Sequence, residues 1–450
     1  MAYFSSALAA LAFYFSLFAV VTSSPALHPR GSKTNTFSVG VSHDADAPRH
    51  GPSDYLKILK KHKLNIPDGL QDVVDTHKTA TKEKAAVADG GSSSAPATSH
   101  DGDLVFMTPV SIGTPPQQLS LDLDTASSDT WVFSTDTDKK MVDGQTLWDP
   151  SKSSTSQSIK NCSWSMLYGD YSTSRGICYK DTLAFGDLSI PDMTIESATS
   201  VSEMFTESSY DSGIVGLAWP SIAETTPRQK TLLDLLPQVL SQPLFTVDLR
   251  HNSSDGSFNF GYINDQLHDS DIQYVNINNS EGFWGVTQSG FGIEGISTKY
   301  EFNEAREVIV DTGSTLLLAP DEAVKTYFDN VPGANYSYAD LGFHLPCNST
   351  PPDFIFEISD DAGGKIMGSI PGKYFIYALA SEGMCYAGIQ SSGYISGTPS
   401  IFGDVFLKSG FAVFDIGNER FGFASKPNLD TNLKKRNPET QPWGLPVVKV

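Results

Sequence analysis

Positive charge is scarce in this sequence. Its 450 residues include 31 Lys and Arg against 52 Asp and Glu, so the net charge is −21. Nucleic acids and anionic membrane surfaces attract basic proteins, and neither is therefore an expected partner. The exception is residues 25–84, where ten basic residues outnumber seven acidic ones. A basic leader before an acidic body suggests that the leader docks on the body, although a solvated linker would have the same composition.

Long apolar runs are also scarce. One run, residues 7–21, is shorter than the ~20 residues that a membrane-spanning helix needs, and small polar residues follow it. We interpret residues 1–24 as a secretory signal peptide cleaved near 22–24, and we expect no membrane anchor. The tail after residue 426 lacks the apolar stretch of a lipid-anchor signal. The expected location is extracellular, with an acidic, vacuole-like compartment as the alternative.

Cysteines are few as well. There are four, and an even number is expected in an oxidising compartment. If the chain between Cys162 and Cys178 forms a hairpin with its tip at Asp170, these two cysteines lie opposite each other, as a disulfide requires. Cys347 and Cys385 would close a loop in the second half, so we predict two bonds. Glycosylation sequons, which are compatible with secretion, begin at Asn161, Asn252, Asn278, Asn335 and Asn348.

The chain contains a long internal repeat. An apolar strand ends in Asp-Thr-small-Ser at Asp124 and again at Asp311, and 92 residues after each aspartate two apolar residues precede Gly216 or Gly403. The offset of 187 residues is far too long for a solenoid. It fits two homologous lobes that each contribute one aspartate.

The pattern from residue 104 onward is that of an all-β protein. Short β-branched and aromatic runs alternate with Gly, Asn, Asp and Ser, and helices are expected mainly at 54–64, 232–240 and 321–329. The predicted divisions are a signal peptide 1–24, a basic leader 25–84, a flexible joint 85–103, an N-terminal lobe with the inter-lobe region 104–295, a C-terminal lobe 296–425 and a tail 426–450.

Two aspartates in contact have a definite chemistry. They cannot both ionise cheaply, so they hold one proton between them. The ionised carboxylate can take a proton from a bound water that attacks a carbonyl carbon, while the protonated one donates to the developing oxyanion. This reaction needs no metal, cofactor or covalent nucleophile.

The sequence resembles the pepsin-like aspartic proteases, above all the secreted fungal ones, over residues 104–425. The matching phrases beyond the two aspartate motifs lie at 164–176, 213–219, 242–245, 282–284 and 400–424. The resemblance implies a bilobal all-β fold, with a cleft between two lobes related by a pseudo-two-fold axis. The leader is similar to the pro-segments of these enzymes.

The resemblance also assigns roles to individual residues. Asp124 and Asp311 are the expected catalytic pair. A flap tyrosine, Tyr168, would close over the substrate with Trp131 as its hydrogen-bond partner, and the neighbouring Asp170 would help to accept a lysine beside the scissile bond, unless it is an ordinary turn residue. The other expected site residues are Thr125, Ser127, Thr312, Gly313 and Ser314, which support the pair, and Gly169 in the flap.

Three residues do not fit the expected motifs: two differ from the family pattern, and one is an additional aspartate beside the first motif. Ala126 stands where the family usually has Gly, and a Cβ is tolerated there only if φ is negative. Tyr171 stands where a flap glycine is usual. Asp122 alternates with Asp124 and therefore points to the same side of the strand; we expect a turned-out or hydrogen-bonded polar residue rather than a catalytic one.

The basic leader acquires a role from this interpretation. We expect Lys60 or Lys61 to lie in the cleft and to pair with the two aspartates at neutral pH, so that the leader acts as an intramolecular inhibitor. Acid would protonate the carboxylates and charge the leader's histidines. The precursor would then cut itself and leave a mature chain that starts near Ala85. Five histidines lie in the leader: His28, His43, His50, His62 and His77.

The expected function is therefore that of a secreted aspartic endopeptidase, made as a zymogen. It would act at acidic pH as a monomer on polypeptides with large apolar residues around the cut. One alternative is a non-catalytic relative that binds peptides or inhibits other enzymes, but both aspartates are present. The other is a two-carboxylate glycosidase, for which the duplicated motif and the flap phrase would have no purpose.

Overall fold

The computed structural model describes residues 36–41, 49–88, 106–167, 173–186, 188–206, 209, 211–251, 253, 256–393, 397–427 and 447–450, without the side chains of 82–88 and 204. The predicted signal peptide, residues 89–105 and the flap residues 168–172 lie outside this part. No helix among the described residues is long and apolar enough to cross a membrane.

One eight-stranded sheet is built from the first half of the body. In sheet order it contains β2 (Met107–Ile112), β3 (Gln117–Asp124), β8 (Gly213–Gly216), β4 (Thr130–Val132), β7 (Leu188–Val201), β6 (Thr173–Phe185), β5 (Gln157–Leu167) and β9 (Thr225–Thr226). Its strands follow the two-residue period of a half-buried sheet: in β5, Cys162 and Trp164 are buried between exposed neighbours. Because β2 also pairs with β6, the sheet curls back on itself. Short 3-10 turns accompany it at Lys139–Met141, Pro150–Lys152, Glu203–Phe205 and Pro220–Ile222.

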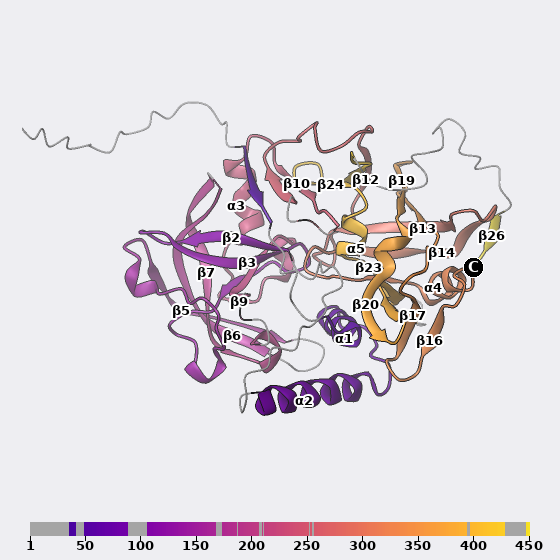
Figure 1. Ribbon diagram of the computed structural model, residues 1–450. Helices are drawn as coiled ribbons and strands as arrows, with labels where there is room; N and C mark the ends of the chain where they lie inside the picture. Colours follow the sequence, from indigo (N-terminus) through magenta and orange to yellow (C-terminus); the bar gives the residue numbers. More distant parts are fainter. Residues whose placement is uncertain are drawn as a thin grey trace, which may run out of the picture. The chain divides into compact units, whose positions relative to one another are not determined.

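Two further sheets are built from the second half (Figure 1). The larger contains β19 (Lys365–Ile370), β18 (Phe354–Ser359), β13 (Gly285–Ile293), β14 (Lys299–Val310), β23 (Ser400–Phe402), β15 (Leu317–Ala319) and β22 (Ile389–Ser391), and β26 (Val447–Lys449) pairs with β14. The smaller contains β16 (Asn335–Ser337), β17 (Gly342–Pro346), β21 (Met384–Ala387) and β20 (Ile376–Ser381). The 3-10 turn Gly372–Phe375 directly precedes β20 in the chain. The fold is thus the predicted bilobal all-β fold.

A six-stranded sheet combines three distant parts of the chain. Its order is β1 (Phe37–Gly40), β11 (Ser257–Phe260), β10 (Leu244–Asp248), β24 (Phe411–Asp415), β25 (Arg420–Ala424) and β12 (Gln273–Asn276). The basic leader therefore supplies an edge strand, β1, and the end of the body supplies two inner strands. Near this sheet the indole N–H of Trp284 donates a hydrogen bond to the carbonyl of Leu217, 2.9 Å away, which connects the two halves.

The two halves repeat the same strand pairing. β3 runs parallel to β8 with Leu123 opposite Val215, and β14 runs parallel to β23 with Val310 opposite Phe402. Each residue of the second pair follows its counterpart by the 187 residues that separate the two aspartate motifs. The sequence repeat therefore corresponds to a repeat in strand register.

The lobe boundary expected at residues 295 and 296 falls inside a sheet. β13, which ends at Ile293, pairs along its length with β14, so it already belongs to the second half. The strand before it, β12, belongs to the six-stranded sheet. The change from one half to the other therefore lies between β12 and β13.

Among the described residues, helices occur at the three expected places and at two further ones. α1 (Gly51–Lys61), α3 (Leu232–Val239) and α4 (Asp321–Phe328) overlap the predictions, and α5 (Asp404–Leu407) is a single turn. α1 ends three residues before the predicted limit, because Lys63 takes a positive φ of 54° and the Leu64 N–H folds back onto the carbonyl of Leu59. The sequence analysis missed α2 (Leu70–Ala88), which continues through the first four residues of the predicted joint.

Two disulfides join the cysteine pairs that the sequence analysis had paired. They are Cys162–Cys178 and Cys347–Cys385. In the β5–β6 hairpin Ser163 lies opposite Ile177 and successive pairs converge symmetrically toward residue 170. This register fits the hairpin that was assumed in order to pair the first two cysteines.

Candidate active site

The two motif aspartates occupy equivalent positions at the ends of buried strands. Asp124 is the last residue of β3 and is 1% exposed, and Asp311 directly follows β14 and is 0% exposed. The Leu217 N–H donates to the carbonyl of Asp124 at 2.7 Å, and the Asp311 N–H donates to the carbonyl of Phe402 at 3.1 Å. Strand pairing thus holds both backbones on the parallel partner strand of their own half.

The two motif threonines cross-link the halves. The N–H of Thr125 donates to Oγ1 of Thr312, and the N–H of Thr312 donates to Oγ1 of Thr125, both at 3.0 Å. Each hydroxyl in turn donates to a carbonyl of the opposite half: Thr125 to Val310 at 2.8 Å and Thr312 to Leu123 at 2.5 Å. All these groups are buried, so the reciprocal hydrogen bonds fix the two aspartate loops against each other.

Backbone N–H groups bind the inner oxygens of both carboxylates. The Ala126 N–H donates to Oδ1 of Asp124 and the Gly313 N–H donates to Oδ1 of Asp311, each at 2.8 Å. The two motifs differ in the hydrogen bonds of their serines. Ser314 donates to Oδ2 of Asp311 at 2.5 Å, whereas the buried hydroxyl of Ser127 has no hydrogen-bond partner among the described residues.

A lysine of α1 bridges the two aspartates. Nζ of Lys61 lies 2.9 Å from Oδ1 of Asp124 and 2.9 Å from Oδ1 of Asp311. Of the two lysines expected to play this part, Lys61 therefore makes the contact, not Lys60. The next residue, His62, adds a contact from Nε2 to Oδ2 of Asp311 at 2.7 Å. The sequence analysis assigned His62 no contact, although its position beside the lysine pair was a usable signal.

These contacts shift the pKa values of Asp311 and Lys61. Burial raises the pKa of Asp311, but the positive charge of Lys61 and the hydrogen bonds from His62 and Ser314 outweigh burial and hold that pKa well below its usual range. Burial also opposes charge on Lys61, but Asp124 and Asp311 raise its pKa above the ordinary value. With α1 in place, these contacts therefore favour the ionised form of Asp311.

Ala126 fits its position without strain. Its φ is not positive, its N–H keeps the hydrogen bond to Asp124, and its methyl group belongs to an apolar cluster with Ile309 and Leu316. The equivalent position in the second half has no space for a side chain: a Cβ on Gly313 would lie 2.7 Å from Cγ of Asp124. The two motifs are thus equivalent in hydrogen bonding but not in the space around the residue after Thr.

Trp131 lies on β4 in an aromatic cluster. Its ring is 5.9 Å from that of Trp164 and meets Phe205 edge-on at 5.4 Å. Its indole Nε1 is buried and has no hydrogen-bond partner among the described residues. The expected partner, Tyr168, lies outside them with Gly169, Asp170 and Tyr171, so this pairing stays a prediction.

Asp122 differs from the expectation. It is only 8% exposed, and no hydrogen bond from a described residue reaches its carboxylate. It is therefore neither turned out nor hydrogen-bonded within the described chain. Burial raises its pKa well above the usual range, the negative charge of Asp124 adds to that shift, and Lys61 opposes it.

α1 contacts the second half at several further points. The Tyr55 hydroxyl donates to the carbonyl of Ser391 at 2.6 Å, and Arg49 donates to the carbonyl of Tyr377 at 2.6 Å. The Tyr377 hydroxyl donates to Oδ2 of Asp54 at 3.0 Å. The apolar face of the helix is buried in the same cluster as Ala126; it consists of Tyr55, Leu56, Ile58 and Leu59.

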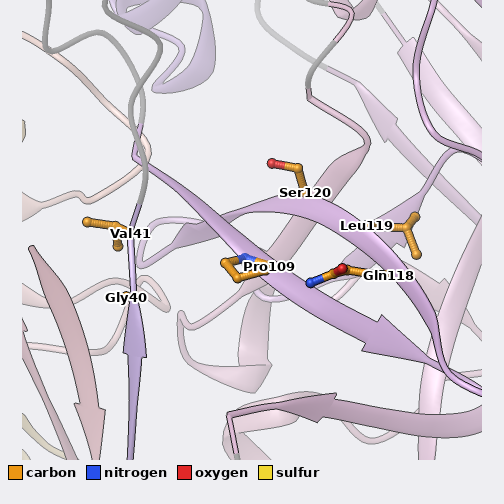
Figure 2. Close-up of a pocket in the computed structure, with 6 residues that line it drawn as sticks. All are labelled: Gly40, Val41, Pro109, Gln118, Leu119 and Ser120. Atoms are coloured by element: carbon orange, nitrogen blue, oxygen red, sulfur yellow. The ribbon is translucent and has the colours of Figure 1, made fainter. Parts of the chain in front are cut away.

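The pocket in Figure 2 lies elsewhere. It has a volume of about 320 Å³ and is lined by Gly40 at the end of β1, by Val41 directly after it, and by the β2 and β3 residues Pro109, Gln118, Leu119 and Ser120. None of these side chains titrates or carries a charge. Catalytic chemistry therefore has no basis in that pocket, and the dyad remains the candidate site.

The sheets and the paired aspartates define an aspartic protease, and comparison with known proteins agrees. Residues 105–426 match the family model described as eukaryotic aspartyl protease. The chain belongs to this family, and it is an aspartic endopeptidase of the pepsin-like kind.

Individual relatives cover most of the chain. Endothiapepsin of Cryphonectria parasitica is 38% identical over 381 residues, which are 84% of this chain and 87% of that protein. Aspergillopepsin-1 of Aspergillus oryzae is 36% identical over 400 residues, or 88% and 95% of the two chains. Penicillopepsin-1 of Penicillium rubens is 35% identical over 378 residues, or 83% and 87%. The alignments are longer than the family domain, so they include sequence outside it.

Proposed function

We propose that the chain is made as a zymogen and hydrolyses peptide bonds at acidic pH by general acid–base catalysis between Asp124 and Asp311. The observation that carries this proposal is the position of Lys61, 2.9 Å from one oxygen of each carboxylate. A single cation satisfies both side chains only because they converge on one point. Once it leaves, a water molecule can take that point.

The reaction follows from the charges of the free pair. Without Lys61, two carboxylates in contact keep one proton between them, as is known for aspartic-protease pairs in general. The ionised member removes a proton from the bound water, whose oxygen attacks the peptide carbonyl carbon. The protonated member donates its proton to the carbonyl oxygen. The N–H groups of Ala126 and Gly313 stabilise the negative charge that is left on the pair.

The segment 49–88 is the proposed inhibitor. Its helix α1 supplies Lys61 to the aspartates and buries its apolar face against the second half, and His62, directly after the helix, contacts Asp311. A substrate cannot reach the carboxylates while Lys61 is bound to them. We propose that acid protonates the pair, removes the ion pairs and releases the segment, after which the chain cuts itself. Since α2 extends to Ala88, the cut is expected after it, in residues 89–105, rather than at Ala85.

The proposed substrates are polypeptides in an extended conformation, which pair their backbone with the enzyme much as an added strand does. Trp131 and the flap residues Tyr168, Gly169 and Asp170 would close over them, and Asp170 would favour lysine beside the cut. Secretion, through removal of residues 1–24, is proposed from the sequence, as is the monomeric state.

Replacing either aspartate tests the reaction. Precursors carrying Asp124→Asn or Asp311→Asn are brought to pH ~4, and their mass and their cleavage of a denatured protein are followed. We expect self-processing to stop and kcat/KM to fall by a factor of roughly 10³ or more, because the pair acts as a unit. Asp271→Asn is the matched control, since this carboxylate is exposed in the loop before β12.

Two results would contradict the proposal, each in a different part. Near-normal peptide cleavage by Asp124→Asn, after its leader has been removed by wild-type enzyme that is then separated from it, would exclude the proposed pair. Normal maturation of the same variant precursor without any added protease would exclude self-processing alone. The amino-terminal sequence of the protein recovered from the culture medium checks secretion and the cut.

A further inference from the structure

A short strand lies beside the first residues of β14 (Figure 1). This strand, β26, runs parallel to β14, and Lys449 lies opposite Glu301. The Val450 N–H donates to the carbonyl of Glu301 at 3.0 Å, and the Asn303 N–H donates to the carbonyl of Val450 at 2.8 Å. β26 lies outside residues 105–426, which match the family model, so the family domain by itself does not account for it.

β26 covers an edge of β14 that would otherwise be open. β13 pairs with β14 from Lys299 to Ile309, so it occupies one side of that strand. On the other side, β23 pairs with Val308–Val310 and β26 pairs with the beginning of the strand. Among the described residues, no further strand pairs with β14. Without β26, residues 299–307 would present unpaired N–H and C=O groups, which are a template for another strand.

Few side-chain contacts hold β26 in place. The side chains of Val447 and Val448 are 50% and 44% exposed, and only Val450 packs against the main apolar cluster. Nζ of Lys449 lies 3.0 Å from Oε2 of Glu301, but the lysine is mostly exposed, and surface ion pairs of this kind contribute little. The strand therefore closes the edge without belonging to the buried core, and its removal should leave both lobes folded.

We propose that residues 299–303 of β14 form an association surface for a second copy of this chain, and that β26 keeps this surface closed. Two identical edges pair about a two-fold axis, which makes their strands antiparallel. With Tyr300 at the axis, Lys299 of each copy lies opposite Glu301 of the other, and opposite charges stabilise directly opposed pairs. With Glu301 at the axis, two like charges would meet, so the register centred on Tyr300 is preferred. Neither aspartate of the candidate site takes part, so the inference is independent of the proposed function.

Removing residues 447–450 tests the proposal. The full-length precursor and a precursor that ends at Pro446 are compared at neutral pH by sedimentation velocity over a range of concentrations. The shortened chain should form dimers with a dissociation constant at least ~10-fold below that of the full-length chain. An excess of the peptide Val-Val-Lys-Val should return it to monomers. The same peptide with an N-methyl group on its last valine lacks the N–H that the Glu301 carbonyl accepts, and it should act at least ~10-fold more weakly.

The outcomes distinguish pairing at this edge from less specific association. Equal association of the two chains, or dimers on which both peptides act alike, would overturn the inference. In the shortened chain, Glu301→Lys should prevent dimers, because it places a lysine opposite Lys299 of the other copy. Glu382→Lys, in the exposed turn between β20 and β21, is the charge-matched control and should leave the dimers intact.

A full-length variant replaces the shortened chain if that chain does not fold. Lys449→Glu sets a second negative charge against Glu301, so β26 should loosen and the same dimers should form. A Lys449→Glu precursor that associates no more than the wild type would then overturn the inference.

Discussion

Lys61 brings one positive charge into contact with two carboxylates that are almost completely buried. Without the lysine, two ionised aspartates in contact would repel each other strongly. The pair must therefore hold a proton when α1 is absent. The bridging ammonium group removes this requirement and allows Asp311 to stay ionised, because its pKa is held well below the usual range. The same residue therefore blocks the site and changes its protonation.

Replacing Lys61 by Met should weaken latency. The Lys61→Met precursor keeps a long apolar side chain but loses both ion pairs, and breaking a buried ion pair typically costs about 3–5 kcal/mol. The dyad recovers part of this by taking up a proton, so we expect self-processing at pH ~6 to be at least ~10 times faster than in the wild type. A mass-spectrometric time course measures it.

Lys63→Met is the control for this substitution. Lys63 lies two residues further along, is exposed and makes none of the contacts to the aspartates. Its variant should process at the wild-type rate. A Lys61→Met precursor that stays as latent as the wild type would show that the apolar face of α1 suffices to keep the segment in place.

At the level of elements, the α1–α2 pair contains an acid-sensitive contact. His50, directly before α1, stacks on His77 of α2 with ring centroids 3.6 Å apart. Burial and then the charge of His77 lower the pKa of His50 from 6.5 to about 4, against the opposing charge of Asp340. Between these two pH values the released segment binds a proton at His50 that the docked segment does not. Docking therefore weakens as the pH falls from 6.5 to 4.

Asp54 acts in the opposite direction. Burial raises its pKa from 3.8 to about 6, although the hydrogen bond from Tyr377 and nearby positive charges lower it. The docked segment therefore binds the extra proton at Asp54, and this group strengthens docking as the pH falls from 6 to 3.8. The two effects overlap in pH, so release by acid depends on the histidine, the dyad and Asp54 together.

Removing the titrating ring of His50 should make the precursor more resistant to acid. Asn at position 50 can still cap α1, as helix starts prefer, but it gains no charge. We expect the midpoint pH of self-processing of His50→Asn to fall by about half a unit or more. His268→Asn, remote on the six-stranded sheet side, should keep the wild-type midpoint. An unchanged midpoint in His50→Asn would mean that the stacked histidines do not contribute to release.

At the level of the whole molecule, two threonines hold the halves in register. The hydroxyl of Thr125 donates to the carbonyl of Val310 and accepts the N–H of Thr312, so its loss leaves two buried backbone groups without a partner. Each such group typically costs about 1–3 kcal/mol. Because the carboxylates belong to the same two loops, loss of these hydrogen bonds should also leave their relative position less fixed.

Thr125→Val should therefore reduce both stability and activity. We expect a loss of about 2–5 kcal/mol in the free energy of unfolding, measured by denaturant titration. A fall of roughly 10–100-fold in kcat/KM follows from a small displacement of the pair. Thr108→Val is the matched control: Thr108 is completely buried, but its hydroxyl has no hydrogen-bond partner among the described residues. If both variants lose the same stability, the hydrogen bonds between the halves are not the cause.

Much of the site was accessible from the sequence because its signals are local or repeated. The 187-residue repeat indicated the two aspartates and two threonines. In the structure the threonines bind each other across the halves, and Lys61 bridges the aspartates. The apolar face of α1 was visible as Tyr55, Leu56, Ile58 and Leu59, since helical spacing can be read directly. α2 escaped notice because its apolar pattern is weak: among the side chains described for this helix, Leu70 and Val74 are the buried ones.

The sequence by itself determined the duplicated motif, the all-β character, the cysteine pairs and the presence of a basic helix before the body. Only the tertiary structure decided which lysine reaches the dyad. Successive helical residues differ by about 100° in direction, so the choice between Lys60 and Lys61 depends on which face α1 buries. It also decided the asymmetry between Ser127 and Ser314. The contacts of Lys61 join residues far apart in sequence, and their charges acquire meaning only when packing removes water from around them.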